Sequence, residues 1–291
     1  MGNIKLAQPR LAIMLLFAFF AFFLILTPII TGGITRLCER PEVAIRLSII
    51  IQDILVFILP AIATALLCTR LPASLLGLDV KPELKQMFLA VLILLCSMPV
   101  MNVIVEWNKN IHLPESMAQL ETTFRNMEDS AQAVVDNLMA GASVGSLIVS
   151  ILIVGVLAGL SEELFFRGGM QRIFICTKMN PHVAIWSVAF IFSIFHFQFF
   201  GFVPRLLLGA YFGYLLWWSK SVWLPIVVHT INNSLVVYFT WHNVNNPDTV
   251  NPDTIGTDLT SSADILLICM SILLTVGLIL YLAKICKANI K

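Results

Sequence analysis

Eight long apolar runs constrain the fold of this chain more than any other feature. A helix needs roughly 20 mostly apolar residues to cross a bilayer. Only 12% of the 291 residues are charged and 58% are apolar, whereas a soluble domain is about 25% charged. The sequence therefore predicts an all-α, polytopic integral membrane protein with eight transmembrane helices, at about residues 11–31, 45–68, 87–105, 144–165, 182–200, 202–218, 221–240 and 264–285.

Composition also limits the classes of partner. The net charge is +1, from 18 Lys and Arg against 17 Asp and Glu, so no nucleic acid or other polyanion is expected. The low charge content excludes a disordered chain and an ordinary cytosolic enzyme. No repeat or polar linker divides the sequence, so residues 1–291 are predicted to form a single integral membrane domain.

The distribution of Lys and Arg predicts the orientation in the membrane. With the N-terminus inside, twelve of these residues fall in inner segments and six in outer segments. Cytoplasmic loops carry an excess of Lys and Arg. We therefore expect a multi-pass protein of the plasma or inner membrane with both termini in the cytoplasm.

Charged residues interrupt the fourth apolar run. Glu162, Glu163 and Arg167 follow a long stretch without any charge. An ionisable residue at the bilayer centre costs about 2.5–3.5 kcal/mol, which makes it a candidate functional residue. Glu163 and Arg167 are four apart and are expected to pair, while Glu162 lies about 100° around the helix and stays free. Alternatively, both acids simply mark the cytoplasmic end of the helix.

Two later runs carry further polar groups. His196 follows Phe192 by four residues in the fifth run, and His229 precedes Asn233 by four in the seventh. At 1.5 Å per residue, Glu162 and His196 lie roughly 21–22 Å from the inner ends of their helices, and His229 and Asn233 lie roughly 12 and 18 Å from theirs. All four are thus predicted in one band of the hydrocarbon core. A lone buried His or Asn can also be a structural residue between helices.

These groups match the requirements of two kinds of hydrolysis. A carboxylate and an imidazole can deprotonate one water, and a second imidazole with an amide can stabilise an oxyanion. The same set could instead ligate zinc. The sequence has no His-Glu-x-x-His, and neither Ser161 nor any Cys lies at helical spacing from a His. Nucleophilic catalysis is therefore not supported.

Three motifs in this order resemble one family. They are Glu-Glu-x-x-x-Arg from Glu162, Phe-x-x-x-His ending at His196, and His-x-x-x-Asn from His229. They are similar to those of the CAAX protease and bacteriocin-processing family, which includes the type II CAAX prenyl endopeptidases, and the similarity covers about residues 144–240.

The resemblance implies a metal-independent intramembrane glutamate endopeptidase with its catalytic helical core at about 144–240. Glu162 and His196 would activate water, and His229 and Asn233 would form the oxyanion hole. Glu163 and Arg167 would shape the site. No cofactor is implied, and the substrate would be a peptide or a membrane-anchored protein, prenylated or not.

Two other functions use the same residues. A zinc-dependent protease would differ only in the metal. A non-hydrolytic transporter or immunity scaffold would keep the polar core without cleaving anything, although a transporter typically shows inverted repeats that this sequence lacks. Asp53, in the second apolar run, has no explanation in any of these hypotheses.

The segment between the third and fourth runs predicts one amphipathic helix. Apolar residues recur there at alternating spacings of three and four, while Glu121 and Arg125 form an i,i+4 pair on the polar face. We expect this helix on the outer membrane face. It either only connects two spans or positions the catalytic ones. Its apolar residues are Met117, Leu120, Phe124, Met127, Ala131, Val134 and Leu138.

Overall fold

The computed structural model describes residues 6–139, 143–246, 248–249 and 252–288, and within these every regular element is a helix. The predicted all-α class is confirmed. Within the described residues, six helical segments are long and apolar enough to cross a membrane: Pro9–Leu37, Pro41–Cys68, Leu84–Lys109, Val144–Cys176, Phe199–Ser219 and Ser262–Cys286. They contain α1 (Pro9–Leu37), α2 (Pro41–Gln52), α3 (Leu59–Cys68), α5 (Leu84–Lys109), α7 (Val144–Ser150), α8 (Ala158–Glu163), α9 (Arg172–Cys176), α11 (Phe202–Ser219) and α13 (Ser262–Ala288).

The eight-span count is not confirmed. The predicted fifth span, 182–200, contains α10 (Pro181–Ile194), which has only 14 residues. The predicted seventh span contains α12 (Trp223–Asn245), which is 23 residues long but includes His229, Asn232 and Asn233. Polar residues lower the hydropathy of a segment, so α12 falls outside the six by composition, whereas α10 falls outside them by length.

The fourth membrane segment alternates between α and π geometry. The segments η3 (Ile151–Leu157) and η4 (Leu164–Gln171) are π-helical. Between them lies the short α-helix α8, whose last two residues are Glu162 and Glu163. A third π segment, η1 (Asp53–Ile58), lies between α2 and α3. π-Helical turns are rare and are found mostly at functional sites. The backbone irregularities of this protein thus concentrate around the candidate residues.

Local sequence signals mark the end of this segment. Its last helix, α9, ends at Cys176. Asn180 then caps α10, because its side-chain oxygen accepts from the backbone N–H of His182, and Pro181 occupies the first helical position. The short turn places α10 antiparallel to the segment before it.

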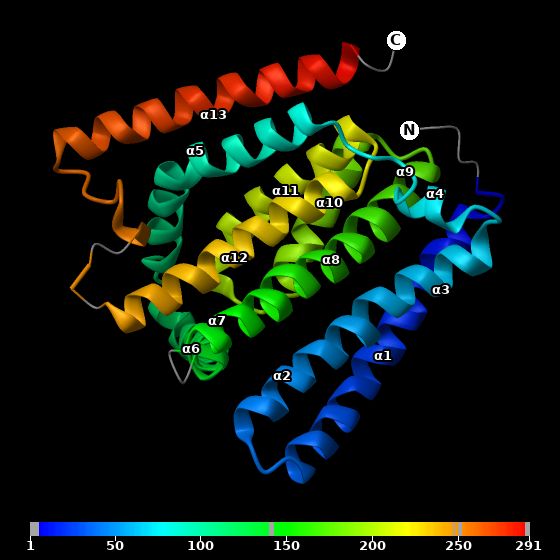
Figure 1. The fold of residues 1–291 in the computed structure, drawn as a ribbon, viewed down its shortest axis with the longest axis horizontal. Coiled ribbons are helices and arrows are strands. Elements are labelled where there is room, and N and C mark those ends of the chain that lie inside the picture. The colour runs from blue at the N-terminus through cyan, green and yellow to red at the C-terminus, as the bar shows by residue number, and fades with distance from the viewer. Residues whose placement is uncertain (1–5, 140–142, 247, 250–251, 289–291) are drawn as a thin grey trace.

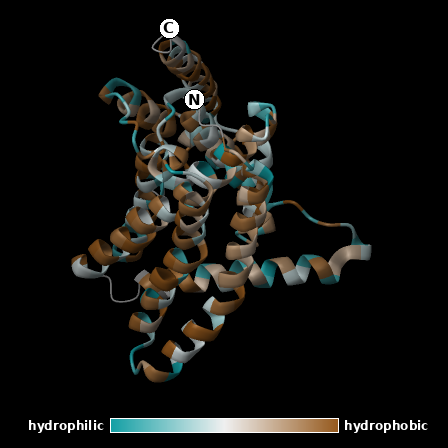
Figure 2. Ribbon diagram, turned by 90° about the vertical axis from the view of Figure 1, so that its right-hand side faces the viewer, coloured by the Kyte–Doolittle hydropathy of each residue, from teal (hydrophilic) through white to brown (hydrophobic). Residues whose placement is uncertain are grey.

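The helices form three groups (Figure 1). At one flank α1 packs on α2 and α3, and at the other α5 packs on α13. Between them lie α8, α10, α11 and α12. The largest buried cluster joins α1 and α3 to η4 through Leu16, Phe165, Phe166 and Met170. Helix α1 begins and α13 ends on the same side of the bundle (Figure 2).

The predicted amphipathic helix is present as α6 (Ala118–Met139), after a short 3₁₀ turn, η2 (Glu115–Met117). It runs across the long axes of the bundle helices, with hydrophobic and hydrophilic residues interspersed along it (Figure 2). The residues predicted for its apolar face differ in burial. Leu138 is buried against the bundle, whereas Met117, Leu120, Met127 and Val134 are exposed. The remaining short helices of the described chain are α4 (Pro72–Leu76), η5 (Phe199–Gly201) and η6 (Pro252–Thr254).

Candidate active site

A buried ion pair anchors the fourth membrane segment. Arg167 Nη1 lies 2.9 Å from Glu163 Oε1, and both side chains are 0% exposed. The predicted i,i+4 pair is therefore confirmed. Arg167 also donates through Nη2 to the backbone carbonyl of Gly209, 3.0 Å away in α11. A buried guanidinium needs such additional acceptors, because the interior offers it no water.

Glycines of α11 make this second contact possible. Gly209 and Gly213 are four apart, and their carbonyls accept from Arg167 and Gln171, which are also four apart. A Cβ on Gly213 would lie 2.8 Å from Ile185 and 2.9 Å from Gln171. The small residues thus allow close helix approach, as Gly-x-x-x-Gly does in membranes. Sequence reasoning missed this contact, although the Gly-x-x-x-Gly spacing was there to signal it.

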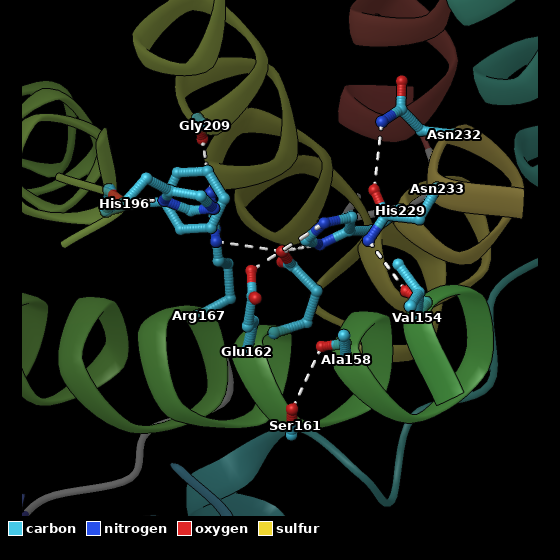
Figure 3. Close-up of polar contacts among 12 residues, drawn as sticks. Val154, Ala158, Ser161, Glu162, Arg167, His196, Gly209, His229, Asn232 and Asn233 are labelled. Carbon is cyan, nitrogen blue, oxygen red and sulfur yellow. Dashed lines mark hydrogen bonds and ion pairs between the residues drawn. The ribbon is translucent and has the colours of Figure 1, made fainter. Parts of the chain in front are cut away.

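His229 of α12 joins the ion pair from the opposite side (Figure 3). Its Nδ1 lies 2.8 Å from Glu163 Oε1, and its Nε2 lies 3.9 Å from Glu162 Oε2. An ionised carboxylate can only accept, so Nδ1 carries the hydrogen and donates to Glu163. The site therefore contains a row of four polar groups, each next to the one before it. They are the guanidinium of Arg167, the carboxylate of Glu163, the imidazole of His229 and the carboxylate of Glu162.

Glu162 and Glu163 occupy different environments, as their adjacent positions on the helix predict. Oε1 of Glu163 accepts from both Arg167 and His229. The Glu162 side chain is 16% exposed, and its buried Oε2 has no hydrogen-bond partner. One carboxylate is thus held by neighbouring groups and the other is available to a bound molecule.

His196 lies outside the helix in which it was expected. Helix α10 ends at Ile194, and His196 is in the following turn, where Phe197 adopts a left-handed φ of 52°. Ser193 Oγ donates to the carbonyl of Phe202, 2.6 Å away, and closes this turn onto the start of α11. The predicted continuous span over 182–200 was therefore wrong at its end, because contacts within the turn replace the helical ones.

The turn fixes the chemistry of the His196 ring. Nδ1 lies 2.8 Å from the carbonyl oxygen of Phe192. Since a carbonyl can only accept, Nδ1 is the donor and Nε2 of the neutral ring carries a lone pair. Because Phe192 precedes His196 by four residues, its backbone carbonyl reaches the His196 ring and selects the tautomer with the hydrogen on Nδ1.

Aromatic rings surround these polar groups. The guanidinium of Arg167 lies 4.5 Å from the centre of the Phe192 ring, and that ring meets His196 edge-on at 4.7 Å. Phe212 stacks on His229 with centres 4.6 Å apart. Apolar walls of this kind exclude water and strengthen the electrostatic interactions inside.

Asn233 lies one turn beyond His229 on α12. Its amide nitrogen donates to the carbonyl of Val154 in η3, 3.2 Å away, and its oxygen accepts from Asn232. The structure thus brings Glu162, His229 and Asn233 together on two facing helices, as the spacing predicted. Among the described residues, no group of three or more His, Cys, Asp and Glu side chains is arranged to hold a metal ion.

Helix α6 holds the segment that follows His196. Phe124 stacks on Phe199 with ring centres 5.1 Å apart, and Arg125 lies 4.0 Å from the centre of the Phe200 ring. Glu128 Oε2 accepts from the backbone N–H of Phe200 at 3.1 Å. These contacts fall on η5 (Phe199–Gly201), three residues after His196. They favour a positioning role for α6 over a mere connection.

The start of α6 is itself fixed by Glu121. Its carboxylate accepts from the backbone N–H of Leu113 at 2.7 Å and pairs with Arg125 at 2.7 Å. These two contacts lower the pKa of Glu121 to about 2, so the group stays ionised at any physiological pH. The predicted Glu121–Arg125 pair is confirmed, and it also orients Arg125 toward Phe200.

Replacing Phe124 with serine is expected to lower kcat of the hydrolysis considered below by up to about 10²-fold, because misplacing a catalytic group by about 1 Å can cost that much. The matched control is Leu120→Ser on the same helix, since Leu120 is 39% exposed and makes no such ring contact. Steady-state kinetics on both variants test this. Equal activity of the two would leave α6 as a connector.

Curated proteins and solved structures gave no match. The model of one family, described as type II CAAX prenyl endopeptidase Rce1-like, matches residues 144–235, which is about a third of the chain. This segment begins with α7 and includes Glu162, His196, His229 and Asn233. The helices that carry the candidate site therefore match the Rce1-like type II CAAX prenyl endopeptidase family, a family of proteases.

Proposed function

We propose that this protein is an intramembrane endopeptidase that hydrolyses a peptide bond with a water molecule activated by Glu162 and His196. The observation that carries the proposal is the buried carboxylate oxygen of Glu162, which has no hydrogen-bond partner among the described residues and lies 3.9 Å from His229 Nε2. A carboxylate and an imidazole that converge in this way can share and deprotonate one water.

His196 is the proton acceptor in this proposal. Its Nδ1 is engaged with the carbonyl of Phe192, which leaves the Nε2 lone pair for the water. Glu162 accepts the second hydrogen of the water and stabilises the imidazolium that forms. The resulting hydroxide attacks the carbonyl carbon of the peptide bond, and His196 then returns the proton to the leaving amine.

His229 and Asn233 stabilise the oxyanion. Nδ1 of His229 already donates to Glu163, so Nε2 can donate to an oxyanion only when the ring is protonated. Nδ1 lies 2.8 Å from Glu163 Oε1 on one side, and Nε2 lies 3.9 Å from Glu162 Oε2 on the other. The amide of Asn233 supplies a second donor when it leaves the carbonyl of Val154.

Replacing Asn233 with alanine is expected to lower kcat by about 10²–10³-fold with little change in KM, the usual result of losing one oxyanion donor. Asn232→Ala is the matched control on the neighbouring position, since its amide donates to the Asn233 oxygen and, within the described part of the chain, to no backbone carbonyl. The kinetics of the two purified variants decide. An unchanged kcat in Asn233→Ala with a reduced kcat in Asn232→Ala would transfer the role to Asn232.

The mechanism needs no metal and no covalent intermediate. Each histidine nitrogen that faces away from the reacting water has a protein partner, Glu163 for His229 and the Phe192 carbonyl for His196. Cleavage is therefore expected to continue in the presence of a strong chelator. Loss of activity on chelation, restored by zinc alone, would support the zinc-dependent alternative instead.

The substrate is a peptide or a membrane-anchored protein that reaches the site within the bilayer. The test is comparative proteomics of membranes that contain either the wild-type protein or Glu162→Gln. A substrate accumulates uncleaved with the variant, and its mass shows whether it carries a prenyl group. Identical proteomes would favour a non-hydrolytic transporter or scaffold.

We further propose one integral membrane domain that crosses the bilayer eight times, with both termini in the cytoplasm. Helix α12 is long enough to cross, and α10 crosses together with the turn that holds His196. An even number of crossings agrees with the start of α1 and the end of α13 on one side of the bundle (Figure 2). The excess of Lys and Arg in the same loops supports this orientation.

A further inference from the structure

One buried carboxyl group has no place in the mechanism above. Asp53 is only 3% exposed, and it begins the π segment η1 between α2 and α3. Its Oδ2 has no hydrogen-bond partner. An ionised carboxylate in such a position, without a cation or sufficient donors, is strongly unfavourable.

The neighbours of Asp53 belong to the candidate site. η1 packs on α8, and the Asp53 carboxyl group interacts with the Ser161 hydroxyl and with the charge of Glu162. Ser161 is fully buried and donates to the carbonyl of Ala158, so its hydroxyl hydrogen is already used. Asp53 therefore lies at the interface between two membrane segments, facing the short helix α8 that carries Glu162.

The other elements around η1 supply no cation to Asp53. Helix α3 has no charged residue, and neither has α1 between residues 11 and 35. Arg46 of α2 donates to Ser146 instead. From α8 and η4 come three further charged groups, of which Glu163 and Arg167 are paired with each other. Glu162 is the remaining one.

Two carboxyl groups in this arrangement cannot both ionise easily, because like charges in a low-dielectric site repel. A single proton shared between them removes the repulsion, as in other carboxyl dyads. Its location follows from the surroundings. Nε2 of His229 lies 3.9 Å from Oε2 of Glu162 and can pair with this carboxylate. Among the described elements around it, Asp53 has no such partner, so the shared proton is assigned to Asp53.

We propose that Asp53 and Glu162 form a carboxyl pair that holds one proton, on Asp53, and that this protonated Asp53 is a positioning residue that keeps Glu162 ionised and oriented toward the reacting water. The inference rests on the proposed function and adds a residue to it. Asp53 contacts neither the substrate nor the water, and its proton stays in place during the reaction.

Three variants of Asp53 separate the effect of a negative charge at this position from the effect of the side chain's size and hydrogen-bond donor. Asp53→Asn retains the size and a hydrogen donor of the protonated acid, so we expect kcat within about threefold of wild type, since volume-conserving changes are tolerated best. Asp53→Ala and Asp53→Leu lose the donor and are expected to lower kcat by about 10–10²-fold with KM unchanged. Activity of Asp53→Ala at the wild-type level would overturn the proposal, as would an Asp53→Asn enzyme as inactive as Asp53→Ala.

The pH profile gives a second readout that a merely structural role would not produce. If Asp53 is protonated in the working enzyme, the acid limb of kcat/KM stays in place in Asp53→Asn. If Asp53 were ionised, its removal would take a negative charge away from Glu162, and the acid limb would move to lower pH. That shift would contradict the proposal.

Infrared spectroscopy tests the proton without reference to activity. Purified wild-type protein at neutral pH is expected to show the carbonyl band of a buried protonated carboxylic acid, which disappears in Asp53→Asn and persists in Glu162→Gln. The opposite pattern would place the proton on Glu162 and refute the inference. If membrane proteomes do not respond to Glu162→Gln, the proposed protease function fails, whereas the infrared result still decides the location of the proton.

Discussion

Replacing Glu162 with glutamine is expected to eliminate measurable peptide hydrolysis while the protein remains folded. The substitution preserves the size of the side chain but removes the carboxylate that orients the water in the proposed mechanism, the partly exposed one of the two adjacent glutamates. General acid–base catalysis typically contributes about 10²–10⁴-fold, so kcat should fall by that factor. His196→Ala and His229→Ala are expected to have the same consequence, through loss of the proton acceptor and of the oxyanion donor.

The measurement is single-turnover cleavage of a substrate identified by proteomics, with the purified protein in bilayers. Glu115→Gln is a suitable control, because Glu115 is exposed in η2, away from the site. Thermal unfolding of each variant shows whether the fold is intact. A Glu162→Gln protein that cleaves at the wild-type rate would refute the mechanism.

Arg167→Ala is expected to destabilise the protein by about 3–5 kcal/mol, the usual effect of leaving a buried charge without its partner. The substitution leaves Glu163 buried without its cation and removes the donor to the Gly209 carbonyl. It also opens a cavity beside Phe192. Activity should fall as well, since Glu163 orients His229.

A double substitution separates the effect of the broken ion pair on stability from the effect of the cavity. In Arg167→Met with Glu163→Gln the unpaired charge is gone and the volume is largely kept, so this variant should be more stable than Arg167→Met alone. Arg36→Ala, at the exposed end of α1, should change stability by less than about 0.5 kcal/mol. Denaturation in mixed micelles measures all of these. Full stability of Arg167→Ala would show that the two charges are not coupled.

Local features of the site could be predicted from the sequence. The Glu163–Arg167 pair depends on helical spacing alone, and the end of the fourth segment depends on Asn180 and Pro181, next to each other in the chain. The amphipathic helix α6 follows from its own periodicity. For such features the interacting groups are within a few residues of each other, so a repeat pattern contains the necessary information.

Other features depend on distant residues and could not be predicted. The turn that holds His196 is fixed in part by Asn108, which donates to the Phe199 carbonyl and accepts from the Val203 N–H. The pairing of His229 with Glu163 joins residues 66 positions apart. Asp53 remained unexplained for the same reason, because its neighbour Glu162 lies in another membrane segment.

The two carbonyl contacts between η4 and α11 have a consequence for motion. Arg167 donates to Gly209 and Gln171 donates to Gly213, so a slide of one helix along the other would break both hydrogen bonds at once. Lipid offers no replacement partners for the freed groups. These two helices must therefore move as a rigid unit. Any lateral opening that admits a polypeptide from the bilayer has to occur between other helices, and cross-linking η4 to α11 should leave substrate entry unimpaired.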